Sequence, residues 1–456
     1  MQITKRDIIW NYGATFLKIA SSILIFPLIL KKMPSEMVGV WSIFMTISAF
    51  ANILDFGFST SFSRNITYVF SGVNELKVRG YQIVELGESK IDYGLLKGVI
   101  NAMRWFYTRI SVLLLIFLLT IGTYYINYIL INYKGDHQEI YIAWIILCFI
   151  SCYNIYTLYY DALLQGKGLI KESKQIIIVG QVLYLLTAGI LISFNYGIIA
   201  IVIAQLISVL TIRLLSYRLF YSIDIGNNLS KVQAYSTQSI LKSMYPNAIK
   251  IGLTSLGGFM VQKSSIFFGS LYLNLSEIAS YGISVQLIVI ISSLASIYTS
   301  TYQPKIAHLR VKQNLKEIKK LYLRGQIVLL ITHFIGGIFL LLCANWALLI
   351  VKSQTFTISP VLLIVLLIIA FLENNHSIAG SILLSSNEVP FFKASLISGI
   401  VTVILLILMF NLFEMRLWAM VLAPGIAHLY NNFKWPYEVA KELKISLKDV
   451  FISFKI

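Results

Sequence analysis

Residues 358–384 read ISPVLLIVLLIIAFLENNHSIAGSILL, a run that is apolar over most of its length and long enough to cross a bilayer as one helix. Comparable apolar runs of about 20 residues recur from one end of the chain to the other. Of the 456 residues, 57% are hydrophobic and 12% are charged, and the mean hydropathy is +0.78. This balance predicts an all-α integral membrane protein and leaves no stretch for a separate soluble domain.

The apolar runs predict about twelve membrane-spanning helices in two sets of six. The first set is expected at Ile8–Leu30, Val38–Thr60, Phe106–Ile131, Ile140–Leu164, Gln175–Phe194 and Gly197–Leu219. The second set is expected at Pro246–Leu271, Ile278–Thr301, Leu323–Ala344, Ile358–Leu384, Phe392–Phe413 and Leu417–Phe433. We therefore expect an N-terminal six-helix bundle over residues 1–220, a cytoplasmic linker over 221–245, and a C-terminal six-helix bundle with a cytoplasmic tail over 246–456.

A weak internal repeat relates the two halves when the chain is shifted by about 241 residues. The shift aligns Ser35-Glu36 with Ser276-Glu277, Ser59-Thr60 with Ser300-Thr301, and Arg64 with Lys305. Two halves in the same orientation would be related by a pseudo-twofold axis along the membrane normal. Transporters use that arrangement to build a central cavity that opens by rocking.

The net charge of +17 is spread over short loops rather than gathered on one helix or arm, so nucleic acid is not an expected partner. Alternate loops hold about 27 Lys and Arg on the side of the N-terminus and about 5 on the other, which predicts that both termini are cytoplasmic. On that side, Gln303–Tyr322 is predicted to form a basic amphipathic helix on the membrane lipids. Its charges come from Lys312, Lys316, Lys319 and Lys320.

Ionisable side chains within the spans are candidate site residues, because a charge at the centre of a span costs about 2.5 kcal/mol or more. Lys18 lies near the middle of the first span, and Lys250 and Lys263 lie on the seventh. We expect Lys18 and Lys263 to face a water-holding cavity that binds anionic substrate. The role of Lys250 is open, because Pro246 would mark the start of its helix. Two arginines nearer the ends of their spans are expected to extend to the surface, Arg109 and Arg213.

The sequence Glu373-Asn374-Asn375-His376 places four polar residues in succession within the tenth span. These residues must face protein or water, because unpaired polar groups in lipid cost several kcal/mol each. One interpretation is that Glu373, with Asn374 and His376, couples transport to H⁺ or Na⁺. The alternative is that Glu373 forms a buried ion pair with one of the lysines and fixes helix packing. Asp55, near the end of the second span, is a further gating candidate.

Tyrosines gather near the end of the fourth span, where Tyr153, Tyr156 and Tyr160 are expected to share one helical face. Aromatic faces stack on sugar rings, which makes Tyr153 and Tyr156 candidate substrate-binding residues. Tyrosines close to a membrane surface also form interfacial belts, so both interpretations stay open.

Motifs for the common enzyme chemistries are absent from the sequence. It contains no G-x-x-x-x-G-K-[ST], H-E-x-x-H, paired C-x-x-C or G-x-S-x-G, and its five histidines are scattered. The three cysteines, Cys148, Cys152 and Cys343, fall inside apolar runs and are expected to pack there. We therefore expect a transporter rather than an enzyme, with no cofactor, metal or disulfide.

Three stretches resemble a known family. The segment LDFGFSTSFSRNITYVFSG (residues 54–72) resembles the one that follows the second helix of O-unit flippase-like proteins, the Wzx-type polysaccharide transporters. The segments DALLQGKG (161–168) and NEVPFFKAS (387–395) resemble the exit from that family's fourth helix and the turn before its eleventh. Asp55 and Arg64 stand at positions that match the first motif, which makes Arg64 a further candidate for substrate binding.

The resemblance implies the multidrug/oligosaccharidyl-lipid/polysaccharide (MOP) transporter fold, with two six-helix bundles around a cationic cleft. It implies a flippase in a bacterial inner membrane that moves undecaprenyl-diphosphate-linked oligosaccharides, such as O-antigen units of lipopolysaccharide, to the periplasmic leaflet by alternating access. Partners would include a polysaccharide polymerase and a chain-length regulator. The family does not fix roles for Lys18, Lys263 or Glu373, which rest on their depth in the spans.

Three other functions remain in view. A polysaccharide polymerase would need a sizeable outer loop with catalytic arginines, whereas the predicted outer loops are short and nearly free of arginine. A multidrug exporter of the same fold would favour acidic and aromatic cavity residues over Lys18 and Lys263. A scaffold for a glycan-assembly complex would give charges within the spans little purpose.

Overall fold

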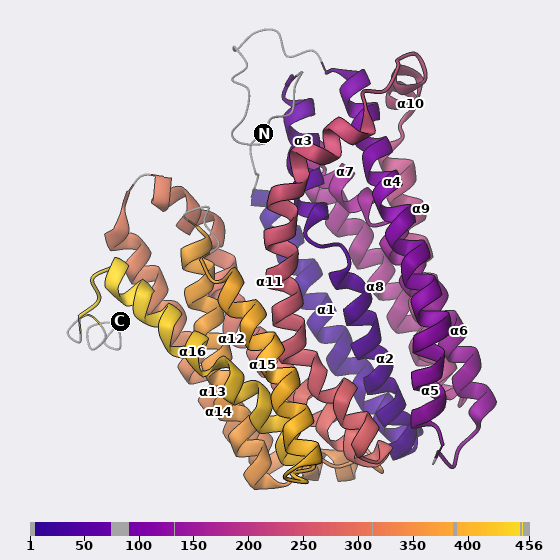
Figure 1. Ribbon diagram of the computed structural model, residues 1–456, viewed down its shortest axis with the longest axis vertical. Helices are drawn as coiled ribbons and strands as arrows, with labels where there is room; N and C mark the ends of the chain where they lie inside the picture. The colour runs from indigo at the N-terminus through magenta and orange to yellow at the C-terminus, as the bar shows by residue number, and fades with distance from the viewer. Residues whose placement is uncertain are drawn as a thin grey trace. The chain divides into compact units, whose positions relative to one another are not determined.

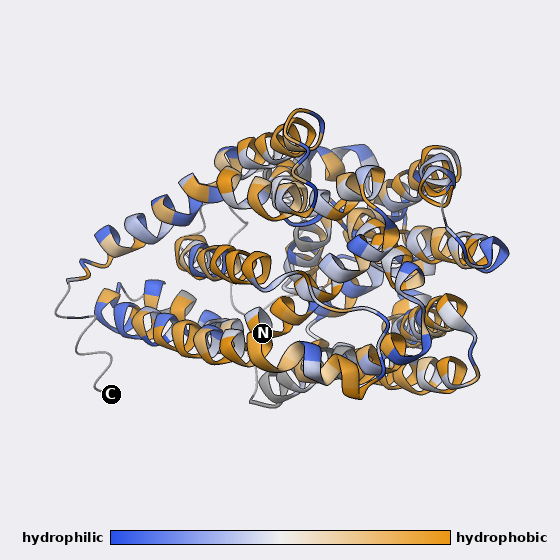
Figure 2. Cartoon of the chain, turned by 90° about the horizontal axis from the view of Figure 1, so that it is seen from below, coloured by the Kyte–Doolittle hydropathy of each residue, from blue (hydrophilic) through white to orange (hydrophobic). Residues whose placement is uncertain are grey.

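The computed structural model describes residues 5–73, 91–131, 133–311, 313–385, 390–446 and 449. Over these residues the regular elements are all helices, which Figure 1 labels in chain order. Among the described residues, nine helical segments are long and apolar enough to cross a membrane. Hydrophobic residues make up much of the length of the helices (Figure 2). The expected all-α membrane class is confirmed.

The helices account for every predicted span. The first half contains α1 (Lys5–Lys32), α2 (Ser35–Ile53), α3 (Phe58–Phe70), α4 (Tyr93–Phe117), a π-helical turn (Leu118–Gly122), α5 (Thr123–Ile129), α6 (His137–Tyr156), α7 (Tyr159–Lys167), α8 (Ile170–Ser193), α9 (Gly197–Phe220) and α10 (Ile223–Ser230). The second half contains α11 (Thr237–Tyr272), α12 (Leu275–Val311), α13 (Leu315–Ile350), α14 (Pro360–Leu384), α15 (Phe392–Asn411) and α16 (Leu417–Glu442). Each predicted span overlaps one or more of these helices, because an apolar run long enough to cross the bilayer also forms a helix.

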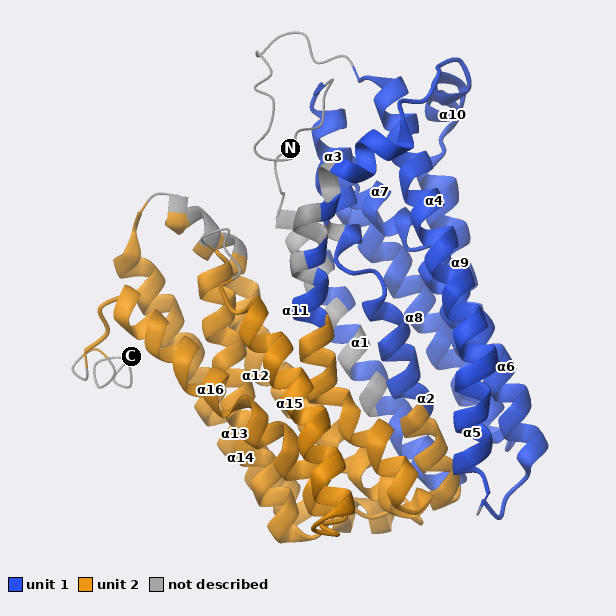
Figure 3. Cartoon of the chain, viewed as in Figure 1, with its two compact units in different colours: residues 1–33, 44–255 blue, residues 34–43, 256–456 orange. Residues whose placement is uncertain are grey.

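The chain divides into two compact units, shown in different colours in Figure 3. Unit 1 comprises residues 1–33 and 44–255, and unit 2 comprises residues 34–43 and 256–456. Within unit 1, α8 packs against both α1 and α9, and α3 packs against α7. Within unit 2, α12 packs against α13, while α14 and α15 both pack against α16.

Two predicted spans are interrupted near their ends. The second was expected to run to Thr60, but α2 ends at Ile53 and α3 starts at Phe58. Between them Phe56 and Gly57 have φ of 46° and 71°, a left-handed conformation that a right-handed helix cannot continue through. The fourth span breaks after Tyr156, so the unbroken helix on which the tyrosine face was predicted is not present.

The expectation that Pro246 marks a helix start was wrong, because α11 begins at Thr237 and runs through that position to Tyr272. A proline inside a long membrane helix is tolerated when neighbouring groups satisfy the carbonyl that it leaves without a donor.

The basic surface helix expected over Gln303–Tyr322 is also absent as a separate element, since the described parts of that segment are the end of α12 and the start of α13. Ile306 and Ile318 belong to the hydrophobic core of unit 2, packed with Trp435 of α16. The ammonium group of Lys319 donates to the carbonyl of Lys444 at 2.8 Å and pairs with Asp449 at 2.5 Å. A hydrophobic face that was read as lipid-facing is instead packed against other helices.

A close crossing of α11 and α15 fixes the helix that carries Lys263. An added Cβ at Gly257 would lie 2.4 Å from the backbone oxygen of Ser395, and one at Gly399 would lie 2.9 Å from the backbone oxygen of Gly257. Both are shorter than normal van der Waals contacts, so the two backbones approach this closely only because these positions lack side chains.

We expect Gly257→Ala to destabilise the folded protein by about 1–3 kcal/mol, because the methyl group overpacks a contact with rigid backbone. The matched control is Gly258→Ala on the same helix, where an added Cβ meets no atom within 4 Å. The midpoint of unfolding in detergent should fall only for Gly257→Ala. Equal midpoints for the two variants would show that the crossing is not tight.

Candidate functional site: a polar pocket within unit 2

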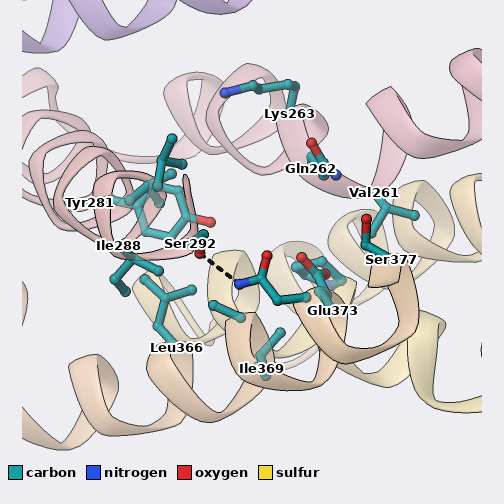
Figure 4. Close-up of a pocket in the computed structure, with 15 residues that line it drawn as sticks. Val261, Gln262, Lys263, Tyr281, Ile288, Ser292, Leu366, Ile369, Glu373 and Ser377 are labelled. Atoms are coloured by element: carbon teal, nitrogen blue, oxygen red, sulfur yellow. Dashed lines mark hydrogen bonds between the residues drawn. The ribbon is translucent and has the colours of Figure 1, made fainter. Parts of the chain in front are cut away.

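A pocket of about 240 Å³ lies among α11, α12, α14 and α16 of unit 2 (Figure 4). Apolar side chains such as Ile288 and Leu366 form much of its wall. The polar side chains that line it are Gln262, Lys263, Tyr281, Ser292, Glu373, Asn374 and Ser377. The pocket therefore gathers three of the residues singled out from the sequence, Lys263, Glu373 and Asn374.

Lys263 and Glu373 project from opposite walls of the pocket, one from α11 and one from α14 (Figure 4). Within the described residues, Lys263 has no hydrogen-bond or ion-pair partner, although its side chain is only partly exposed. The carboxylate of Glu373 faces the Nδ1 of His428 on α16 at 3.6 Å. The basic partner of Glu373 is thus His428 rather than Lys263. An unpaired ammonium group in a low-dielectric site attracts an anionic group strongly.

A row of polar side chains continues from Glu373 between α14 and α16. The ring of His428 lies edge-on to that of His376, with centroids 5.1 Å apart. The Nδ1 of His376 lies 3.2 Å from the Oδ1 of Asn432. The Nδ1 of His428 is buried without a hydrogen bond in the described structure, so a proton could be exchanged between it and Glu373 after a small movement. His376 lies in this row rather than in the pocket lining.

The amide of Asn374 contributes to helix packing at the pocket. Its Nδ2 donates to the Oγ of Ser292 on α12 at 2.7 Å, the hydrogen bond drawn in Figure 4. A satisfied amide inside the protein avoids the desolvation cost of a lone polar group and sets the distance between α14 and α12. Asn374 therefore holds the pocket wall together.

Pro424 explains how α16 meets the pocket. Proline has no N–H, so the carbonyl of Met420, four residues earlier, loses its helical donor. In the structure the hydroxyl groups of Ser265 on α11 and Tyr281 on α12 donate to that carbonyl at 2.8 and 3.2 Å. Three helices thus join at one freed carbonyl, and Tyr281 also lines the pocket.

Other residues singled out from the sequence lie in unit 1, whereas the residues that line this pocket belong to unit 2. Asp55 accepts hydrogen bonds from the hydroxyl of Tyr107 at 2.5 Å and from the backbone N–H of Ser59 at 3.0 Å, so it stabilises the start of α3. Arg64 is exposed on α3.

The two candidate tyrosines also lie in unit 1, on α6. Tyr153 stacks on Phe149 with ring centroids 6.0 Å apart, and Tyr156 is 37% exposed. The side chains of Lys18 and Lys250 lie outside the described part of the structure.

The expectation that Arg213 extends to the membrane surface was wrong. Its side chain is 6% exposed and forms an ion pair with Asp161 at 2.9 Å. It also donates to the Oδ1 of Asn154 at 2.8 Å, and Asn154 in turn donates to Asn52. A buried partner outweighs the tendency of a long cationic side chain to extend toward water.

Sequence reasoning missed His428, Tyr281 and Pro424. His428, like Glu373, is a titratable residue inside a predicted span. The argument that such residues are candidate site residues would therefore have selected His428 as well. Tyr281 carried no such signal, because a single tyrosine in an apolar run is common. Pro424 pointed to a freed carbonyl, but the sequence could not show which hydroxyl groups reach it.

Of the protein families, curated protein sequences and solved structures compared with the chain, only solved structures match it. No protein-family model and no curated protein sequence matches the chain. Among solved structures, an inward-facing multidrug resistance MATE family transporter of the MOP superfamily superposes with a TM-score of 0.67 at 14% identity, covering 96% of this chain and 98% of that one. The lipid II flippase MurJ in an inward closed conformation gives a TM-score of 0.60 at 15% identity, covering 99% and 90%.

A third similar structure is a MOP superfamily transporter from Pyrococcus furiosus, described as having a binding pocket of reverse polarity. It gives a TM-score of 0.55 at 16% identity, covering 96% of this chain and 94% of that one. At these identities the likeness concerns the fold. The chain has the fold of MOP superfamily transporters, as the sequence predicted.

Proposed function

We propose that this protein is a flippase that moves lipid-linked oligosaccharides, carried on undecaprenyl diphosphate, from the cytoplasmic to the periplasmic leaflet of a bacterial inner membrane. The observation that carries the proposal is the ammonium group of Lys263, which has no partner among the described residues and lies in a polar pocket of a MOP-type fold. The likeness to a lipid II flippase supports it, because that protein also has a lipid-linked substrate by its name. Transport by alternating access requires no bond chemistry, in keeping with a transporter rather than an enzyme.

The physical barrier to such transport is the charge of the diphosphate. Moving one unpaired ion into hydrocarbon costs of order 20 kcal/mol in the idealised limit, so the phosphates need a polar path with cationic groups. Lysine suits a ligand that must later be released, because its ammonium group is a mobile point charge rather than a rigid clamp. Lys263 supplies such a group, and the hydroxyl and amide groups around it can bind sugar hydroxyls.

The remaining candidates keep their proposed roles. Lys18, Lys250 and Arg64 would contribute to diphosphate binding, and Tyr153 and Tyr156 would stack on sugars. Both termini would be cytoplasmic, and a polymerase and chain-length regulator would act on the delivered units.

Deletion of the gene tests the proposal when the lipid carriers are extracted and their accessibility from the periplasmic side is measured. Loss of the flippase should leave complete repeat units on the inner leaflet. Unjoined units that reach the periplasm would indicate a polymerase instead and would exclude the flippase.

Export of cationic drugs is the second candidate function, favoured by the carboxylate of Glu373 in the same pocket. The similarity to a multidrug resistance MATE transporter is compatible with it. Cells that express the protein would then lose a fluorescent cationic dye faster than cells without it, and lipid carriers would be unchanged on deletion. The two candidates therefore give opposite results in the same pair of assays.

We further propose that Glu373, with His428 and His376, couples transport to a H⁺ or Na⁺ gradient. Asp55 would act as a gating residue in unit 1. Glu373→Gln keeps the shape of the side chain but removes its charge change. We expect this variant to transport about a hundredfold more slowly, which is the lower end of what a positioned proton-transfer group contributes. Its residual rate should no longer respond to collapse of the ion gradient.

The control for Glu373 is Glu438→Gln, which removes a carboxylate that pairs with Lys434 at 2.7 Å on the same helix as His428. That variant should keep the response to the gradient. Transport by Glu373→Gln at the wild-type rate, with an unchanged response, would remove Glu373 from the coupling mechanism.

A further inference from the structure

A second basic site lies in unit 1, where α4 meets the start of α7 and the end of α9. The guanidinium carbon of Arg104 on α4 lies 5.8 Å from the ring centroid of Tyr159 and 5.9 Å from that of Tyr221. Its Nη2 also donates to the hydroxyl of Tyr221 at 3.3 Å. Arg104 is exposed, so the rings form a floor beneath a cation that faces outward.

The tyrosines under Arg104 form a continuous chain of ring contacts. Tyr159 and Tyr160 have centroids 4.3 Å apart, Tyr160 and Tyr217 6.1 Å, and Tyr217 and Tyr221 5.0 Å. Arg104 closes this chain by contacting both Tyr159 and Tyr221. Rings packed against one another hold the guanidinium in place, so little conformational entropy is lost when a ligand binds.

Arg104 has no carboxylate partner among the residues that the structure describes. The acidic residue of α7, Asp161, is already paired with Arg213 at 2.9 Å. Another cation is close, since the ammonium group of Lys167 lies 5.7 Å from the ring of Phe220, which itself contacts Tyr221. The cluster therefore has excess positive charge and several N–H donors, a combination suited to phosphate oxygens.

The position of the cluster identifies the source of the phosphate. Tyr217 lies in the last turn of α9, and Tyr221 directly follows that helix, so we expect both at the depth of lipid headgroups, where tyrosines are enriched. From there an exposed stripe runs back along α9 through Tyr217, Leu214 and Leu210, which are 47%, 51% and 40% exposed. The spacing of three and four residues places them on one helical face, where an acyl chain can lie.

We propose that Arg104 and the tyrosines Tyr159, Tyr160, Tyr217 and Tyr221 bind the headgroup of an anionic phospholipid. The guanidinium binds the phosphate, the ring chain supports it, and the stripe on α9 contacts the acyl chain. This site lies within unit 1 and does not depend on the identity of the transported substrate.

Native mass spectrometry of the full-length protein, titrated with phosphatidylglycerol or phosphatidylcholine, tests the site. Phosphatidylglycerol should be retained in preference to phosphatidylcholine. Arg104→Gln should weaken this retention about tenfold, the effect expected from losing a charge-assisted hydrogen bond. Arg109→Gln is the matched control, because it removes the same charge from the same helix, where the guanidinium lies 3.6 Å from the ring of Trp105 instead.

A second variant guards against misfolding of Arg104→Gln. Tyr221→Phe keeps the ring and removes the hydroxyl that binds Arg104, and it should weaken phosphatidylglycerol retention about threefold. Equal loss in Arg109→Gln would show general attraction of an anionic lipid to a basic protein and would overturn the proposal. Equal retention of the two lipids, or displacement by inorganic phosphate at millimolar concentration, would also overturn it.

Discussion

Replacement of Lys263 by glutamine is expected to lower the rate of lipid-linked oligosaccharide transport by about 10- to 100-fold, because a charge-assisted contact with a phosphate contributes about 1.5–3 kcal/mol. The change should not unfold the protein, since no described group pairs with this ammonium. An uncharged side chain of similar length removes the cost of holding a cation inside a span, so stability should stay equal or rise. Transport of a fluorescent lipid-linked sugar in proteoliposomes measures the effect.

Two further variants separate charge at the pocket from charge in general. Lys263→Arg keeps the cation and should retain much of the rate, although a guanidinium that binds phosphate in a bidentate manner can slow release. Lys320→Gln removes an exposed lysine on α13 and should transport at the wild-type rate. If Lys263→Gln instead matches the wild type, while Glu373→Gln abolishes dye efflux, the pocket binds cations and the flippase proposal is wrong.

The helical membrane fold could be predicted because its signal is local and repeated. Each apolar run predicts a helix by itself, because a single segment in the lipid bilayer can satisfy all its backbone hydrogen bonds only as a helix. The ends of the helices were predicted less well, because they depend on backbone conformation and tertiary packing, which hydropathy does not report. At Phe56 and Gly57 a left-handed turn ends α2, and near Gln303–Tyr322 tertiary packing converts a basic surface segment into part of the core.

The site could be predicted only as a set of buried charges. Depth in a span selected Lys263, Glu373 and Asn374, which line one pocket in the structure, because an ionisable or amide group in hydrocarbon must face protein or a cavity. The sequence could not show which partner each group has. Glu373 lies on α14 and His428 on α16, and only the fold brings the carboxylate to 3.6 Å from the Nδ1 of His428.

The same limitation produced the error at Arg213, whose position near a helix end predicted a surface cation. Asp161 lies on α7 and Arg213 on α9, and nothing in their spacing along the chain indicates an ion pair. The ion pair between Asp161 and Arg213 changes the expected effect of mutating either residue. Removing a neighbouring acid from a surface arginine would change the stability little, whereas removing the counter-ion of a buried arginine destabilises the fold.

Asp161→Ala is therefore expected to destabilise unit 1 by about 3–5 kcal/mol, the cost of leaving a buried charge without its partner. Arg213 would keep only its hydrogen bond to Asn154, since its side chain is 6% exposed and cannot readily reach water. The free energy of unfolding, measured by titrating detergent-solubilised protein with SDS, should fall accordingly. Asp224→Ala, an exposed acid on α10 of the same unit, should change it by no more than about 1 kcal/mol.

The double variant Asp161→Leu with Arg213→Leu distinguishes the ion pair from simple loss of packing at Asp161. Removing both charges together should restore much of the lost stability, because apolar residues that replace a buried pair are often neutral or stabilising. The coupling between the two positions should then exceed the 0.3–0.5 kcal/mol or so found for independent sites. Additive losses at the two positions would mean that the carboxylate and the guanidinium do not stabilise one another, and that Arg213 reaches water after all.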